Sequence, residues 1–170
     1  MQQSANKAIT AGWAIFMMVL SNFMASPACA QQNLQWHSFE DAIAIADSTQ
    51  RPIFVDVWAP WCGWCRKMKR EVYPELKQQL RSSFVLTRIN RDDTQTTHRY
   101  NGNKLSSLKL AQQLKTRSVP AMVLLNAKGE YILQLSGFME AVKLKPVLGY
   151  IRSGAYRSMR FENFKEQQEL

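Results

Sequence analysis

The stretch that decides the fold is Val55-Asp56-Val57-Trp58-Ala59-Pro60-Trp61-Cys62-Gly63-Trp64-Cys65. It begins inside Ile53–Trp58, a short apolar and β-branched run that predicts a strand buried on both faces. Ala59-Pro60-Trp61 breaks the strand, and a helix is expected to start at the cysteines and run to about Val72. Two cysteines separated by two residues therefore lie at the junction between a buried strand and the following helix.

This position gives the two cysteines a predicted redox chemistry. Unpaired N–H groups and the helix dipole favour negative charge at a helix start, which lowers the pKa of a thiol there. We therefore expect Cys62 to attack a substrate disulfide, and Cys65, expected to be the more buried, to resolve the mixed disulfide. The pair could instead be half of a zinc site, but His37 and His98 lack paired spacing and are interpreted as surface residues. No metal and no cofactor is expected.

The first thirty residues have the pattern of an export signal. Lys7 is their only charged residue, an apolar stretch follows from about Ala8 to Leu20, and small residues at Ala28 and Ala30 match a cleavage site. We expect cleavage with the mature chain starting near Gln31, which would make the protein an exported one. A membrane anchor is one alternative, although the apolar core is short for a span. A lipoprotein acylated at Cys29 is another.

Composition limits the remaining classes. The chain has 170 residues and a hydrophobic fraction of 46%, which is typical of one globular domain. If Cys29 leaves with the signal, two cysteines remain, too few for a disulfide framework that replaces a core. The net charge of +9 could suggest nucleic acid as a partner. Because the charges are dispersed and an exported protein rarely meets nucleic acid, none is expected.

The rest of the chain predicts alternating helices and strands around the quoted stretch. We expect a helix over 39–48 capped by Ser38, a helical piece over 75–81 after Pro74, a strand over 83–90, a helix over 106–115, a hairpin of strands at 120–126 and 131–135, and a helix over 140–151. The polar segment 91–103 is expected to be a loop, or an insertion with little core. This order predicts an α/β fold with a central mixed β-sheet flanked by helices. The expected organisation is a signal peptide at 1–30, one domain at 31–154 and a C-terminal tail at 155–170.

Two separated motifs give the chain a family resemblance. The quoted stretch resembles the active-site strand and turn of thioredoxins. Ser118-Val119-Pro120-Ala121, followed by Val123-Leu124-Leu125, resembles their cis-proline segment and next strand, and Gly129 and Gly137 match a hairpin turn and a later family glycine. The resemblance implies a thioredoxin fold over about Leu34 to Ile151 and thiol:disulfide oxidoreductase activity.

Smaller features resemble one subgroup. Trp64, the following Arg66-Lys67-Met68, the polar insertion and Ser153-Gly154-Ala155-Tyr156 are similar to periplasmic thioredoxins associated with bacterial sulfur oxidation. They are also similar to the soluble domains of periplasmic disulfide reductases. The spacer Gly63-Trp64 departs from the Gly-Pro of cytosolic thioredoxins.

The resemblance also implies a role for each site residue. Pro120 would be cis and would leave the backbone of Val119 free to pair with an extended substrate. Asp56 would lie buried behind Cys65 and handle its proton, its pKa raised by burial without a partner. Arg88 stands where the family usually has a lysine. The substrate groove would be formed by Trp61, Gly63, Trp64, Val119, Pro120 and Gly137.

We therefore expect a periplasmic thiol:disulfide oxidoreductase that reduces disulfides in protein substrates. It would act as a monomer and be recharged by a membrane electron donor of the disulfide-reductase type. Two alternatives remain open. One reverses the direction and makes the protein a disulfide oxidase or isomerase, and the other is a non-catalytic binding or chaperone module.

Overall fold

The computed structural model describes residues 33–168. The chain divides into two units, Met1–Asn33 and Leu34–Leu170, and the second unit contains the fold. The predicted export signal and Cys29 lie outside the described residues, as do the last two residues of the predicted tail.

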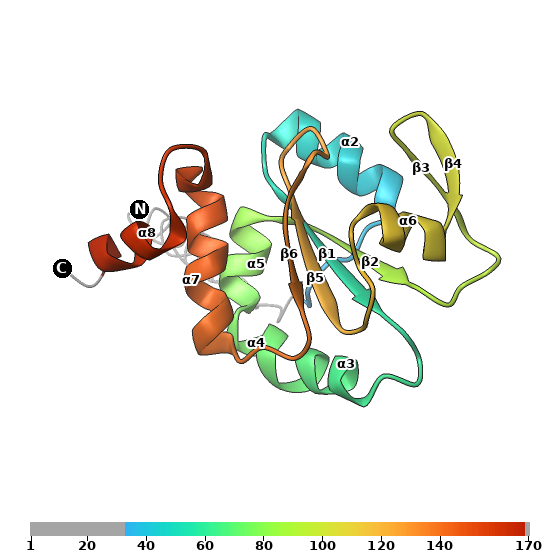
Figure 1. Cartoon of the computed structure of the whole chain (residues 1–170), viewed down its shortest axis with the longest axis horizontal. Helices are drawn as coiled ribbons and strands as arrows, with labels where there is room; N and C mark the ends of the chain where they lie inside the picture. The colour runs from blue at the N-terminus through green and yellow to red at the C-terminus, as the bar shows by residue number, and fades with distance from the viewer. Residues whose placement is uncertain (1–32, 169–170) are drawn as a thin grey trace, which may run out of the picture. The chain divides into compact units, whose positions relative to one another are not determined.

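A four-stranded mixed sheet with the order β2-β1-β5-β6 forms the centre of this unit (Figure 1). β1 (Ile53–Trp58) pairs in parallel with β2 (Val85–Asn90) and in antiparallel fashion with β5 (Ala121–Leu125). β6 (Tyr131–Ser136) pairs antiparallel with β5. The prediction of an α/β fold with a mixed sheet is confirmed.

Helices cover both faces of the sheet (Figure 1). On one face lie α2 (Phe39–Thr49) and α6 (Ser107–Gln113), and on the other lie α3 (Gly63–Lys67), α4 (Tyr73–Glu75), α5 (Lys77–Ser83) and α7 (Ala141–Arg152). Ser38 caps α2 by accepting a hydrogen bond from the Asp41 N–H at 3.1 Å, as the sequence predicts.

The side chains of β1 divide the apolar core in two, because successive residues of a strand point to opposite faces. Ile53, Val55 and Val57 pack with the residues of α2 and α6. Phe54 packs with residues of the helical run from Met68 through α5 and with residues of α7. By the same alternation, Asp56 lies on the face that α3 to α5 cover. The strand is buried on both faces, which confirms its prediction.

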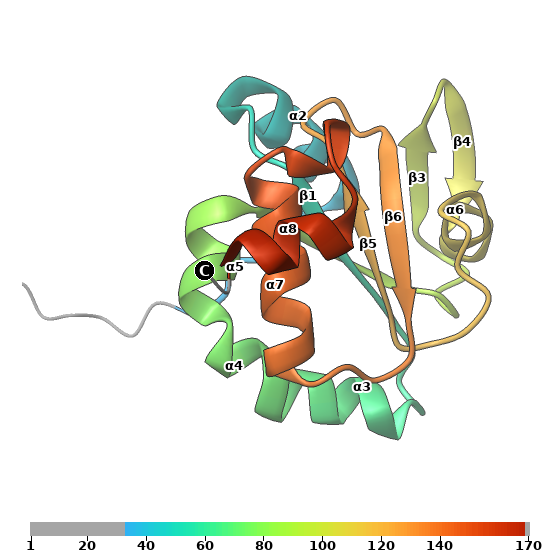
Figure 2. The same ribbon diagram turned by 60° about the vertical axis from the view of Figure 1, so that its left-hand side comes forward.

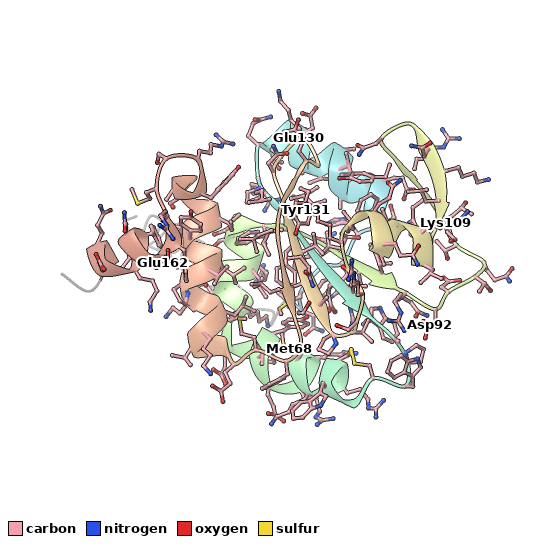
Figure 3. All side chains as sticks on the ribbon, in the orientation of Figure 1. Met68, Asp92, Lys109, Glu130, Tyr131 and Glu162 are labelled. Atoms are coloured by element: carbon pink, nitrogen blue, oxygen red, sulfur yellow. A yellow bond between two sulfur atoms is a disulfide. The ribbon has the colours of Figure 1, made fainter. Side chains whose placement is uncertain are left out.

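The helical run after the cysteines widens for one turn. Met68–Val72 is a π-helical segment between α3 and α4, and the Tyr73 N–H donates to the Met68 carbonyl. Pro74 lies in the first turn of α4, where its missing N–H is tolerated. The predicted helix end near Val72 is therefore a change of helical geometry, and the chain continues as a helix through Glu75. Met68, labelled in Figure 3, is buried between this run and the sheet.

The prediction of a loop over 91–103 is wrong in its second half. β3 (Thr97–Tyr100) and β4 (Asn103–Ser106) form an antiparallel hairpin, a sheet of its own. Asn101 and Gly102 form the turn, with φ angles of 50° and 76°. The segment was predicted as a loop because its composition is polar. The inward side chains of the hairpin nevertheless attach it to the main core.

His98 is one of those inward side chains, so its interpretation as a surface residue is also wrong. It pairs across the hairpin with Leu105, is 6% exposed, and its Nε2 lies 2.9 Å from the Ser107 hydroxyl. Its ring packs edge-on to Phe39, with centroids 6.0 Å apart. His98 therefore has a packing role in attaching the hairpin.

The tail docks on the domain. A short 3₁₀ helix at Ala155–Arg157 precedes α8 (Phe161–Gln168), which lies across α7 (Figure 2). Phe164 is buried, and its ring centroid lies 5.4 Å from that of Tyr150 on α7. Of the helices in residues 33–168, none is long and apolar enough to cross a membrane.

Candidate redox site

The two cysteines form a disulfide at the start of α3. Cys62 and Cys65 are joined with an S–S distance of 2.03 Å and a Cα–Cα distance of 5.3 Å. Cys62 is the N-cap residue, and its Sγ accepts a hydrogen bond from the Cys65 N–H at 3.0 Å. A thiolate at this sulfur would face the N–H groups of the helix start, which stabilise negative charge. The arrangement is that of a thiol–disulfide exchange centre.

Burial does not distinguish the two cysteines in this oxidised state. Each is 4% exposed, so the prediction that Cys65 is the more buried is wrong for the disulfide form. The asymmetry lies in the hydrogen bond at the helix start, which favours negative charge on Cys62.

Three segments meet at the disulfide. The Val119–Pro120 peptide bond is cis, as the resemblance implies, and Val119 packs against Cys62 and Cys65. The Pro120 carbonyl accepts a hydrogen bond from the Gly137 N–H at 2.8 Å, with Gly137 at a φ of +82°. The structure thus brings together the cysteine helix, the proline loop and the loop between β6 and α7.

Two exposed aromatic side chains and one partly buried one border this meeting point, and we call Trp61, Trp64 and Phe138 the aromatic rim. Trp64 is 57% exposed, and its ring centroid lies 5.2 Å from that of Phe138. The Lys67 ammonium stands 5.4 Å from the Trp64 ring centroid and 4.9 Å from that of Phe138. The sequence did not single out Phe138, because only its position after Gly137 connects it with the site.

Trp61 belongs to the rim, but it contacts the segment that follows β2. It is 62% exposed, and its indole N–H donates to the Asp92 carboxylate at 2.6 Å. The Arg91 guanidinium lies 5.6 Å from the Trp61 ring centroid. Asp92, labelled in Figure 3, follows β2 at the start of the polar insertion, so the insertion positions one wall of the site. The polar composition of this segment predicted a loop and indicated no role for Asp92.

Asp56 lies buried in β1, two residues before Trp58, which packs against the cysteines. It is 2% exposed, and each carboxylate oxygen has a partner. Oδ1 accepts a hydrogen bond from the Tyr73 hydroxyl at 2.8 Å, and Oδ2 accepts one from Arg88 Nε at 2.8 Å. The prediction of a carboxyl group without a partner is therefore wrong, although its burial is confirmed.

Aromatic rings hold Arg88 in place. Its guanidinium lies 5.0 Å from the Trp36 ring centroid and 4.9 Å from that of Trp58. We call Asp56, Tyr73, Arg88, Trp36 and Trp58 the buried carboxylate cluster. Because Arg88 is sandwiched between two rings and bonded to the carboxylate, it is a fixed charge beside Asp56.

The electrostatics of the cluster favour a proton on Asp56 at a higher pH than usual. Burial raises the pKa of Asp56, and the charge of Arg88 and the hydrogen bonds from Tyr73 and Arg88 oppose that rise. Burial and the neighbouring Asp56 charge raise the pKa of Tyr73 well above its ordinary value, so this phenol stays a donor. The net effect of the cluster is that Asp56 keeps its proton to a higher pH than an exposed carboxyl group would.

The described residues 33–168 contain no group of three or more His, Cys, Asp or Glu side chains placed to hold a metal ion. His37 forms an isolated bridge to Thr87 through its backbone, and His98 packs in the core as described above.

Known proteins share this region. The family model for a thioredoxin-like domain matches residues 39–152. Thioredoxin of Pyropia yezoensis is 34% identical over 76 residues, which cover 45% of this chain and 58% of that protein. The disulfide bond reductase DsbH of Chlamydia pneumoniae is 24% identical over 115 residues, which cover 67% of this chain and 69% of that protein. The chain therefore spans little more than half the length of the first relative.

A solved structure has a similar arrangement of elements. A thioredoxin-fold protein from Helicobacter pylori superposes with a TM-score of 0.59 over 71% of this chain and 81% of its own, at 22% sequence identity. At this identity the likeness concerns the fold alone.

Proposed function

The chain belongs to the thioredoxin-like family, and from that premise we propose that it is a thiol:disulfide oxidoreductase that reduces disulfides in exported proteins. One observation carries the proposal: the Cys62–Cys65 disulfide lies at a helix start, packed against the residue that precedes the cis Pro120. Proteins of this kind act on disulfides in protein substrates.

In the proposed reaction, the reduced protein gives two electrons to the substrate. The Cys62 thiolate attacks one sulfur of the substrate disulfide, and the other substrate sulfur leaves as a thiolate. The Cys65 thiol gives its proton to Asp56, and the resulting thiolate attacks Cys62 Sγ. The substrate sulfur that was bonded to Cys62 then leaves as a thiolate, and the protein keeps the Cys62–Cys65 disulfide.

The groove for the substrate would run between the aromatic rim and the proline loop. Val119 would offer its backbone to an extended substrate segment, and Pro120 and Gly137 would hold that backbone in place through their hydrogen bond. Trp61, Gly63 and Trp64 would contact the residues that flank the substrate cysteine. The exposure of both tryptophans supports this proposal.

Location, direction and partners are further parts of the proposal. The signal-like residues 1–30 support an exported, periplasmic protein whose domain spans 31–154, with 155–170 as a docked tail. The name of the relative DsbH, a disulfide bond reductase, supports the reducing direction. We propose a membrane electron donor, a monomeric state, and membership of the subgroup similar to sulfur-oxidation thioredoxins.

The equilibrium of the Cys62–Cys65 disulfide with glutathione tests the direction. We expect a reduction potential near the thioredoxin value of about −270 mV rather than the strong-oxidant value of about −120 mV. A value near the oxidant end would favour the oxidase or isomerase. If a variant lacking both cysteines kept full activity towards partner proteins, the site would be a binding or chaperone module.

A trapping experiment tests the order of attack. Cys65→Ser should accumulate covalent complexes with protein substrates, because Cys62 attacks and nothing resolves the mixed disulfide. Cys62→Ser should accumulate none. Equal trapping by both variants would contradict the assignment of Cys62 as the nucleophile.

A further inference from the structure

We propose that the cleft between α7 and α8 is a docking surface for anionic phospholipid headgroups at a membrane surface. The cleft has a volume of about 660 Å³ and is lined by residues of α7 and α8 and by Gln79 of α5. In Figure 2 α8 crosses in front of α7. The cleft shares no residue with the redox site, the aromatic rim or the buried carboxylate cluster.

The floor of the cleft is apolar. Phe161 and Phe164 of α8 face Pro146 and Gly149 of α7 across it. Gly149 lies close to the Phe164 ring, since a Cβ built at this position would be 3.8 Å from it, in ordinary van der Waals contact. Val142, at the start of α7, is 74% exposed, the largest exposure among the large apolar side chains of residues 33–168. This surface can take up the apolar part of an amphiphile.

The border of the cleft is cationic. It carries Lys143, Lys145 and Lys165. Lys143 pairs with Glu140 at 3.8 Å, but both side chains are mostly exposed, so this ion pair is weak. No ion pair of Lys145 or Lys165 is found within residues 33–168. Ammonium groups without carboxylate partners beside an apolar floor attract an anionic amphiphile.

The residue types favour a lipid surface over an acidic protein. Interfaces between proteins are depleted in lysine and enriched in arginine, whose fork matches carboxylates. All three cations at the cleft are lysines. Lysines beside aromatic and aliphatic side chains are typical of surfaces that lie on anionic membranes, where each contributes to the attraction. An exported protein that exchanges electrons with a membrane donor would stay close to that donor and keep its redox site free.

Sedimentation with lipid vesicles tests the proposal. The processed chain is mixed with vesicles of phosphatidylglycerol and phosphatidylcholine in equal parts, or of phosphatidylcholine alone. We expect binding to the anionic vesicles only, lost at high salt. The variant K143Q/K145Q/K165Q should bind roughly 100-fold more weakly, because each lysine near an anionic surface contributes about fivefold. Val142→Ser should weaken binding by roughly threefold through its lost apolar contact.

A matched variant separates a site from general charge. K104Q/K109Q/K128Q removes the same charge from exposed lysines on β4, α6 and the β5–β6 turn. Figure 3 shows Lys109 on the side of the domain away from Glu162 of α8. This variant should bind the anionic vesicles almost as well as the wild type. Equal losses in the two variants, or equal binding to phosphatidylcholine alone, would overturn the proposal. Exchange with a small aromatic disulfide, unchanged in all variants, checks the fold.

Discussion

The aromatic rim and the buried carboxylate cluster both combine aromatic rings with a cation, one at the surface and the other around a buried carboxylate. In the rim, Lys67 lies over Trp64 and Phe138, and the rings remain largely open to solvent at Trp64. In the cluster, Arg88 lies between two tryptophans and binds a carboxylate that is 2% exposed. Both regions place a cation on aromatic rings, but only one of them is accessible.

The difference shows how access decides what such a contact does. A cation on an exposed ring gains little, about 0.5–1 kcal/mol, and the ring remains free to contact another molecule. A cation bonded to a buried carboxylate has a larger effect, because removing it leaves a buried charge without a partner. The rim is therefore expected to govern recognition, and the cluster to govern stability and proton transfer.

The largest expected effect comes from breaking the buried ion pair. Arg88→Met keeps an apolar contact with the tryptophans and leaves Asp56 without its cation. We expect the free energy of unfolding in urea at neutral pH to fall by about 3 kcal/mol, because one charge remains buried and unpaired. The double variant D56N/R88M should recover part of this loss. A double variant as unstable as Arg88→Met alone would mean that Arg88 acts by packing.

A smaller effect, of a different kind, is expected at the rim. Trp64→Ala should slow the exchange with a protein disulfide such as insulin by roughly tenfold, because a large exposed aromatic contact with the substrate is lost. Exchange with a small aromatic disulfide should hardly change, and the free energy of unfolding should change by less than about 1 kcal/mol.

Leu108→Ala is the matched control for Trp64→Ala. Leu108 is also a large apolar side chain, 47% exposed, but it lies on α6 and outside the site. It should leave both exchange rates unchanged. Equal slowing of the two substrates in Trp64→Ala would place Trp64 in the support of the disulfide rather than in substrate contact.

The smallest expected effect is a pH dependence of stability. Folding raises the pKa of Asp56 above its ordinary value of 3.8, mainly through burial. Between the unfolded and folded pKa values the folded state holds more protons, so this group lowers stability as the pH rises. Asp56→Asn cannot ionise and should gain stability relative to the wild type from about pH 4 upward.

Urea unfolding of both proteins between pH 3 and pH 8 measures that difference. The diagnostic quantity is how the difference in unfolding free energy between the two proteins changes with pH. Asp56→Asn also removes the carboxylate partner of Arg88, but this loss adds an offset that does not change with pH. A difference that shrinks as the pH rises would mean that Arg88 and Tyr73 lower the pKa of Asp56 more than burial raises it.

Sequence patterns predicted the elements whose apolar residues have a clear period. β1 reads as a buried strand from its β-branched run, and the cysteine helix follows from the Cys62 position and the break at Pro60. The hairpin β3–β4 was missed because only a few inward side chains, His98, Tyr100 and Leu105, attach it to the core. Asn101-Gly102 was the available signal, since this dipeptide is typical of hairpin turns.

The site was predicted unevenly for a similar reason. Cys62, Cys65 and Pro120 belong to local motifs, which one sequence can show. Tyr73 and Phe138 join the site through contacts across the fold, with Asp56 and Trp64, and no spacing along the chain encodes such contacts. Arg88 was found only as a counterpart of a family lysine, and its two tryptophan neighbours were not foreseen.

The small exposed fraction of the two cysteines affects which molecules can exchange electrons with them. Each cysteine is 4% exposed. A small thiol therefore gains no protein contact that would help it approach the sulfur along the axis of the S–S bond. A protein that covers the neighbouring exposed tryptophans gains contact area at the moment its own thiolate approaches. Exchange with low-molecular-weight thiols would therefore be slower than exchange with proteins, although both would reach equilibrium with the same disulfide. Two redox pools in one compartment could then approach equilibrium at different rates, set by access to the sulfur atoms rather than by potential.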